Sequence, residues 1–98
     1  MNIITAQELK AKIENNDSFQ LIDVREDYEY DDANIGGVNI PLENILGSLD
    51  KIDNEKQVIF CCRTGKRSAA IIHTLERKHK LDNLYSLVGG VVGYFEMP

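Results

Sequence analysis

One short segment of the chain combines a thiol with three cations. Cys62 ends an apolar run, and the loop that follows it contains Arg63, Lys66 and Arg67. Ser68 then opens an apolar pattern typical of a helix, so the thiol lies between the end of a strand and the start of a helix. The backbone N–H groups of such a turn can converge on one point, and the helix N-terminus adds positive potential. Because both effects stabilise an anion, the sequence predicts a reactive thiolate at Cys62.

Three reactions suit a thiolate in an anion-binding loop: sulfur transfer, phosphate-ester hydrolysis and arsenate reduction. In sulfur transfer, the cysteine takes a sulfur atom from a donor such as thiosulfate, carries it as a persulfide and passes it to a second nucleophile. Cysteine-dependent phosphatases use a Cys-x-x-x-x-x-Arg loop that encloses a tetrahedral phosphate. The loop here, in which Arg63, Thr64, Gly65 and Lys66 separate Cys62 from Arg67, is one residue shorter. A tighter loop is better matched to a single sulfur, and arsenate reduction usually needs a resolving cysteine, so we favour sulfur transfer.

The second cysteine, Cys61, is predicted to be a structural core residue. Adjacent strand residues point to opposite faces, so Cys61 and Cys62 should not share an environment. A Cys-Cys dipeptide lacks the spacing of a zinc site and few other soft ligands are present, so we predict no metal and no other cofactor. A reactive thiolate needs no general base. His73 and His79, which follow the loop at a distance, are therefore predicted to be surface or packing residues.

Composition and charge exclude several classes of protein. With 98 residues, 43% apolar and 28% charged, the sequence predicts one globular domain over residues 1–98 with one modest core. A net charge of −5 argues against a nucleic-acid-binding surface. The first residues lack the basic and apolar regions of a signal peptide, and no apolar stretch approaches the ~20 residues of a membrane span. We therefore expect a cytoplasmic protein without membrane association.

Strands and helices are predicted to alternate around Cys62. Strands are expected at residues 3–4, 19–24, 38–41, 57–62 and 84–88, and helices at 5–15, 42–50, 68–80 and 91–96, with residues 25–32 forming a short helix or a loop. This alternation predicts an α/β fold with a mostly parallel sheet and helices on both faces. Asp23 and Arg25 come at the carboxyl end of the strand 19–24, the edge at which sites assemble in such sheets. We assign both residues a supporting role, in which the carboxylate accepts loop N–H bonds and the arginine pairs nearby.

Four stretches of the chain together resemble one known family. They are Leu21–Arg25, Ile35–Leu42, Cys62–Ser68 and Leu87–Gly90, and their order and spacing are similar to those of a single rhodanese domain over nearly the whole length. The resemblance implies a sulfurtransferase with a five-stranded parallel sheet flanked by helices. It implies that Cys62 is the nucleophile and that the loop from Arg63 to Arg67 stabilises the persulfide.

Two positions depart from the common rhodanese pattern. Asn34 stands where many rhodaneses have a histidine, and Tyr94 where many have a tryptophan. The stretch from Ala33 to Gly37 is more similar to the rhodanese modules attached to sulfurylases that charge ubiquitin-like sulfur carriers. The resemblance therefore implies a small sulfur donor and acceptor, and as a protein partner a sulfur carrier or a thioredoxin-like protein.

Several alternatives remain open at the level of the sequence. Arg67 either pairs with a carboxylate and braces the loop or contacts the anion directly, while Arg63 and Lys66 are expected to meet the donor. Acidic residues before the first Gly-Gly pair form either a solvated face or a docking surface for a basic partner; they are Glu26, Asp27, Glu29, Asp31 and Asp32. A non-catalytic binding module that presents the loop to a partner is the main alternative to an enzyme.

Overall fold

Five parallel strands form the centre of the computed structural model, which describes all residues from 1 to 98. The strands are β1 (Asn2–Ile4), β2 (Gln20–Asp23), β3 (Val38–Asn39), β4 (Val58–Cys61) and β5 (Leu84–Leu87), in the spatial order β1-β5-β4-β2-β3. Every neighbouring pair is parallel, so all five strands end at the same edge of the sheet. The predicted five-stranded parallel sheet is confirmed.

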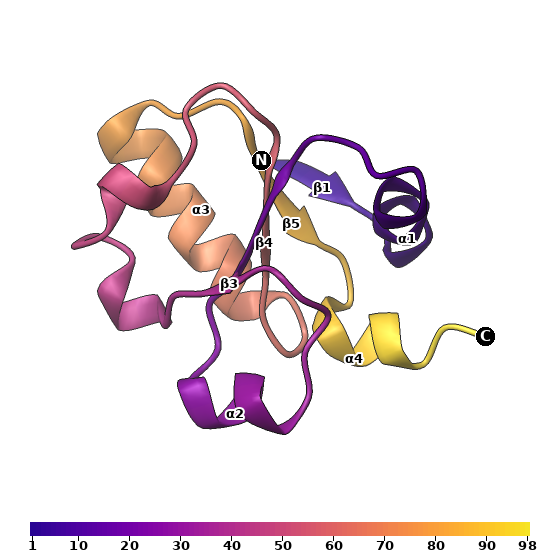
Figure 1. Ribbon diagram of the computed structural model, residues 1–98. Coiled ribbons are helices and arrows are strands. Elements are labelled where there is room, and N and C mark those ends of the chain that lie inside the picture. The colour runs from indigo at the N-terminus through magenta and orange to yellow at the C-terminus, as the bar shows by residue number, and fades with distance from the viewer.

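Helices cover both faces of this sheet. They are α1 (Ala6–Glu14), α2 (Asp27–Asp32), α3 (Lys66–His79) and α4 (Gly90–Phe95). Figure 1 shows α3 on one side of the sheet and α1 and α4 on the other, with α2 beyond the carboxyl ends of the strands. The predicted α/β arrangement is therefore confirmed, and residues 25–32 include a short helix. None of the helices has the length and apolar character needed to cross a membrane.

The alternation of side chains along β4 divides the core into two clusters. Val58 and Phe60 lie in the cluster that packs against α3, and Cys62 joins them there. Ile59 and Cys61 lie in the cluster covered by α1 and α4. The two cysteines thus occupy opposite faces of the sheet, as the period of a strand requires.

The stretch 42–50 does not form the predicted helix. It contains two separate 3₁₀ turns, Leu42–Asn44 and Leu49–Lys51. Gly47 lies between the two turns, and glycine destabilises a helix interior because its backbone loses the most freedom there. Ile45 is fully buried, so one apolar residue of the helical pattern still reaches the core.

Candidate active site

Parallel pairing brings the residues singled out in the sequence to one edge of the sheet. Asp23 at the end of β2 pairs with Cys61 at the end of β4, so the segments that follow both strands leave the sheet side by side. Cys62 is the first residue after β4, and α3 begins at Lys66. The loop between them is therefore held between a buried strand and a helix start.

Two backbone N–H groups, one in this loop and one in the first turn of α3, point at the Cys62 sulfur. The Gly65 N–H donates to Sγ with an N···S distance of 3.1 Å, and the Ser68 N–H donates at 3.4 Å. The Ser68 hydroxyl oxygen lies 3.7 Å from Sγ. Gly65 adopts φ +107°, a conformation that side chains with a Cβ rarely take, and this conformation allows the tight turn. The arrangement can hold a sulfur anion without a neighbouring cation.

The first turn of α4 holds the opposite side of the loop. The Val91 N–H donates to the Cys62 carbonyl at 2.9 Å, and the Val92 N–H donates to the Arg63 carbonyl at 3.1 Å. With these carbonyls directed at α4, the later N–H groups of the loop are free to face the sulfur. Gly90 makes the approach possible, because a Cβ there would collide with the carbonyl groups of Arg63 and Cys62. Sequence reasoning included Gly90 only in the stretch Leu87–Gly90 that resembles the family, and it missed this support.

Asp23 and Arg25 form a buried ion pair beside the loop. The Arg25 Nη2 lies 2.8 Å from the Asp23 Oδ2, and the two side chains are 6% and 0% exposed. The Arg25 backbone N–H also donates to Asp23 Oδ1 at 3.0 Å, and Nη2 donates to the Ala33 carbonyl at 2.7 Å. The pair therefore ties the end of β2 to the end of α2, and a supporting role of both residues in the reaction stays a prediction.

Arg67 makes a second ion pair, with Glu29 on α2. The guanidinium donates to both carboxylate oxygens, at 2.9 Å and 3.2 Å. These hydrogen bonds lower the pKa of the Glu29 carboxyl to about 2. The pair joins the first turn of α3 to α2, so Arg67 braces the loop in this structure. A direct contact between Arg67 and a donor stays a prediction.

The remaining loop side chains point to solvent, whereas the thiol does not. Arg63, Thr64 and Lys66 are exposed, and neither cation forms an ion pair. Cys62 is only 1% exposed. The rim of the loop is therefore exposed to solvent, whereas the sulfur lies beneath it.

Cys61 is equally buried but lacks such donors. Burial raises the pKa of the Cys61 thiol, and the nearby Asp23 carboxylate raises it further. Both effects favour the neutral thiol over the thiolate, which is the nucleophilic form. This environment fits the structural role predicted for Cys61.

A groove of ≈480 Å³ lies next to the loop, between α2 and α4. Arg63 lines it from the loop, Glu29 and Asp32 from α2, and Val92 and Phe95 from α4. Tyr28 and Phe95, both lining residues, are 70% and 50% exposed. The groove is thus acidic on one wall and apolar on the other, with one loop cation between them.

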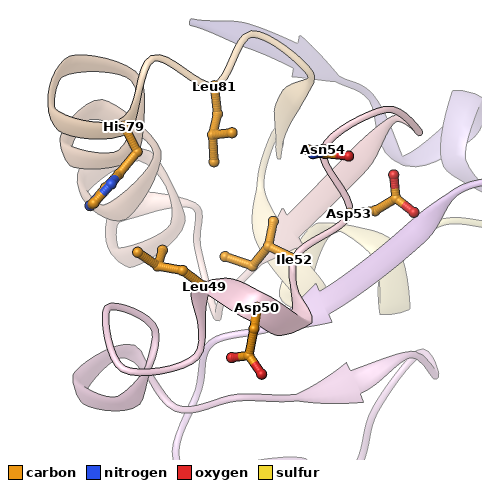
Figure 2. Close-up of a pocket in the computed structure, with 7 residues that line it drawn as sticks. All are labelled: Leu49, Asp50, Ile52, Asp53, Asn54, His79 and Leu81. Carbon is orange, nitrogen blue, oxygen red and sulfur yellow. The ribbon is translucent and has the colours of Figure 1, made fainter.

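A second pocket of ≈490 Å³ lies at the other end of the molecule. Figure 2 shows its lining residues, which come from the second 3₁₀ turn, the connector before β4 and the end of α3; they are Leu49, Asp50, Ile52, Asp53, Asn54, His79 and Leu81. None of them belongs to the loop after β4 or to its supporting ion pairs. This pocket is therefore separate from the candidate site.

Comparisons with known proteins give consistent matches. The "Putative sulfurtransferase YtwF" of Bacillus subtilis (strain 168) is 36% identical over 76 residues, which cover 76% of this chain and 74% of that protein. The "Probable adenylyltransferase/sulfurtransferase MoeZ" of Mycobacterium tuberculosis (strain ATCC 25618 / H37Rv) is 29% identical over 94 residues, which cover 93% of this chain but only 24% of MoeZ. The crystal structure of a rhodanese-like domain protein from Staphylococcus aureus superposes with a TM-score of 0.86 at 27% identity, covering 96% of this chain and 91% of that one.

The match extends to the family level and includes nearly the whole chain. The sequence model of the family described as "Rhodanese-like domain" matches residues 5–97, which include the strands β2 to β5, the loop after β4 and all four helices. With the parallel fold and the loop geometry, this match shows that the chain belongs to the rhodanese-like domain family.

Proposed function

We propose that the protein is a sulfurtransferase that carries sulfane sulfur as a persulfide on Cys62. The observation that carries the proposal is the convergence of the Gly65 and Ser68 N–H groups on Cys62 Sγ. Preorganised donors aimed at a developing negative charge stabilise it without reorganisation during the reaction. Membership of the rhodanese-like family and the names of its relatives support sulfur transfer in general.

The reaction needs two displacements at sulfur. The Cys62 thiolate attacks the outer sulfur of a donor such as thiosulfate, forming an S–S bond while the donor's own S–S bond breaks and sulfite leaves with the electron pair. An acceptor nucleophile then attacks the terminal sulfur of the persulfide, and Cys62 leaves as the thiolate. No proton has to be moved by the protein at the sulfur, so the absence of a histidine at position 34 is compatible with this scheme.

The loop residues divide between the carried sulfur and the donor. We assign the Gly65 and Ser68 N–H groups to the anionic sulfur, because they already face Sγ. We assign Arg63 and Lys66 to the sulfonate of the donor, because both cations are exposed at the mouth of the loop and free of ion pairs. Thr64 lies between these two cations and completes the rim of the loop.

We place the acceptor in the groove between α2 and α4. Arg63 lines this groove and is adjacent to Cys62, so an acceptor lying there reaches the loop directly. A small thiol or the tail of a sulfur-carrier or thioredoxin-like protein would meet the apolar side chains of Val92 and Phe95 on one wall. The acidic residues of α2 form the other wall, and they would favour an acceptor that carries basic residues.

Mass spectrometry after treatment with thiosulfate tests the proposal. We expect the intact mass to rise by about one sulfur atom, and the added sulfur to be removed by cyanide as thiocyanate. C62A should gain no sulfur, whereas C61A, which removes the neighbouring thiol, should gain it normally. No gain in the wild-type protein with thiosulfate or with a low-molecular-weight persulfide would instead identify a non-catalytic binding module.

A further inference from the structure

Ser86 buries a hydroxyl in the middle of the sheet. It lies on β5, between β1 and β4, and is 4% exposed. It pairs with Phe60 and faces the α3 side of the sheet, where the buried core cluster is mostly aliphatic and aromatic. A buried hydroxyl is costly unless it is hydrogen bonded, and an alanine or valine would fill the same space without that cost. The presence of a hydroxyl at this buried position therefore calls for an explanation.

The only hydrogen-bond partner of the Ser86 hydroxyl is Ser68. The two Oγ atoms lie 2.8 Å apart, and either can donate. Ser68 is fully buried at the start of α3, and its own Oγ lies 3.7 Å from Cys62 Sγ. Ser86 is thus one hydrogen bond away from the group that contacts the sulfur.

The hydrogen bonds available to Ser68 depend on the charge of the sulfur. A serine hydroxyl has one proton to donate and two lone pairs that accept. When Cys62 is a thiol, its S–H can donate to Ser68 Oγ, and Ser68 can donate to the Gly65 carbonyl at 3.0 Å. When Cys62 is a thiolate, the sulfur can only accept, so a favourable contact requires Ser68 to turn its proton toward Sγ.

This change in direction costs little at the Gly65 carbonyl. The same carbonyl accepts the Ala69 N–H at 3.0 Å, so it keeps a partner when Ser68 turns away. The turned Ser68 hydroxyl requires a donor to its lone pairs. Its proton, and not its oxygen, then faces the anion. Ser86 is the hydroxyl in position to be that donor.

We propose that Ser86 is a positioning residue, which donates to Ser68 Oγ and thereby directs the Ser68 proton to the anionic sulfur of Cys62. The resulting chain runs from Ser86 to Ser68 to Cys62, and hydrogen bonds in such a chain strengthen one another. The inference deepens the proposed function, since it concerns the ionisation of the same thiol. It assigns a role to a residue outside the loop motif.

The pH dependence of Cys62 alkylation by iodoacetamide tests the inference, because only the thiolate reacts. The experiment uses the full chain with C61A, so that Cys62 is the only thiol. We expect S86A to move the pH midpoint of alkylation upward by about half a unit to one unit, and S68A to move it at least as far. Other ionisable groups around the loop are unchanged by S86A; they are Asp23 at the end of β2, Arg25 just after it, Glu29 on α2, and Arg63, Lys66 and Arg67 in the loop and the first turn of α3.

A double-mutant cycle separates positioning from a structural role. If Ser86 acts through Ser68, S86A should add no further shift in a protein that already carries S68A. A midpoint that S86A leaves unchanged, or a shift of full size in the S68A background, would overturn the inference. If Ser86 only fills space, its substitution would alter the thermal midpoint of unfolding and would not change the pH midpoint of alkylation.

A matched pair of variants keeps the test decisive if S86A folds poorly. S86T and S86V have side chains of the same shape and differ in the hydroxyl. We expect S86T to retain the wild-type alkylation midpoint and S86V to show the upward shift; equal midpoints would contradict the inference. Because alkylation needs no sulfur donor, this result stands apart from the mass-spectrometric test of sulfur loading, and either can fail alone.

Discussion

The surroundings of Cys61 and Cys62 differ far more than their burial does. The two residues are adjacent and are 0% and 1% exposed. Cys61 faces the apolar cluster under α1 and α4, with the Asp23 carboxylate nearby, whereas Cys62 faces two N–H groups of the loop and the first turn of α3. Under the proposed function, in which Cys62 reacts and Cys61 does not, burial by itself does not decide whether a thiol is reactive. The polar groups that face the sulfur decide it, and a strand places its neighbouring residues in front of different groups.

Removing each thiol in turn should give the largest difference in activity between the Cys61 and Cys62 positions. C62A should lower turnover of thiosulfate and cyanide to thiocyanate by at least about a hundredfold, because no other group can form the persulfide. C61A should retain most of the activity, since alanine replaces a buried thiol without leaving an unpaired polar group. Equal loss of activity in the two variants would abolish the proposed distinction.

Displacing α4 should disturb the loop after β4, because the first turn of α4 bonds the Cys62 and Arg63 carbonyls. In G90A the new Cβ would collide with the carbonyls of Arg63 and Cys62, and φ +62° is unfavourable for alanine. We expect unfolding to become easier by on the order of 2 kcal/mol, with sulfur loading reduced by more than the loss of folded protein explains.

Gly47 is a matched control for that substitution. A Cβ at Gly47 would meet its nearest atom, the Asn44 carbonyl oxygen, at an ordinary 3.7 Å. We expect G47A to change the free energy of unfolding in urea little and to load sulfur normally. If G90A behaved like G47A, the support of the loop by α4 would be refuted.

Alkylation of the folded protein should distinguish the two thiols kinetically. Loop and helix-start N–H groups face the Cys62 sulfur, whereas Cys61 lies in the cluster under α1 and α4 and its raised pKa disfavours the thiolate. We expect peptide mapping to find iodoacetamide on Cys62 at neutral pH and on Cys61 only after unfolding in urea. Labelling of both thiols at similar rates in the native protein would contradict the difference between their surroundings.

Acid should weaken the Glu29–Arg67 ion pair, which braces the loop after Cys62. This is the smallest of the expected effects. The pKa of Glu29 is about 2 in the folded protein, below its ordinary value of 4.5. The pair therefore stabilises the fold above pH ~4.5, and this contribution is lost as the pH falls toward 2. Because both side chains are partly exposed, we expect E29Q to cost about 1 kcal/mol at pH 7 and progressively less in acid. Urea unfolding of both proteins at several pH values measures this, and a constant difference between them down to pH 2 would contradict it.

Patterns within single segments were sufficient to predict most of the fold. The apolar strands and the helix expected at residues 5–15 depend on neighbouring residues, and the structure contains five strands and a helix over Ala6–Glu14. Opposite environments for Cys61 and Cys62 follow from the period of a strand alone. The same kind of pattern failed at residues 42–50, where Gly47 outweighed the apolar spacing.

The contacts around the thiol were decided only by the tertiary structure. The sequence placed Cys62 before a cationic loop, but it left the partner of Arg67 open and did not indicate Gly90 or Ser86 as supports of the site. Glu29, Gly90 and Ser86 lie far from the loop along the chain and reach it through α2, α4 and β5. Such contacts depend on how strands are ordered and helices packed, and no local spacing carries that information.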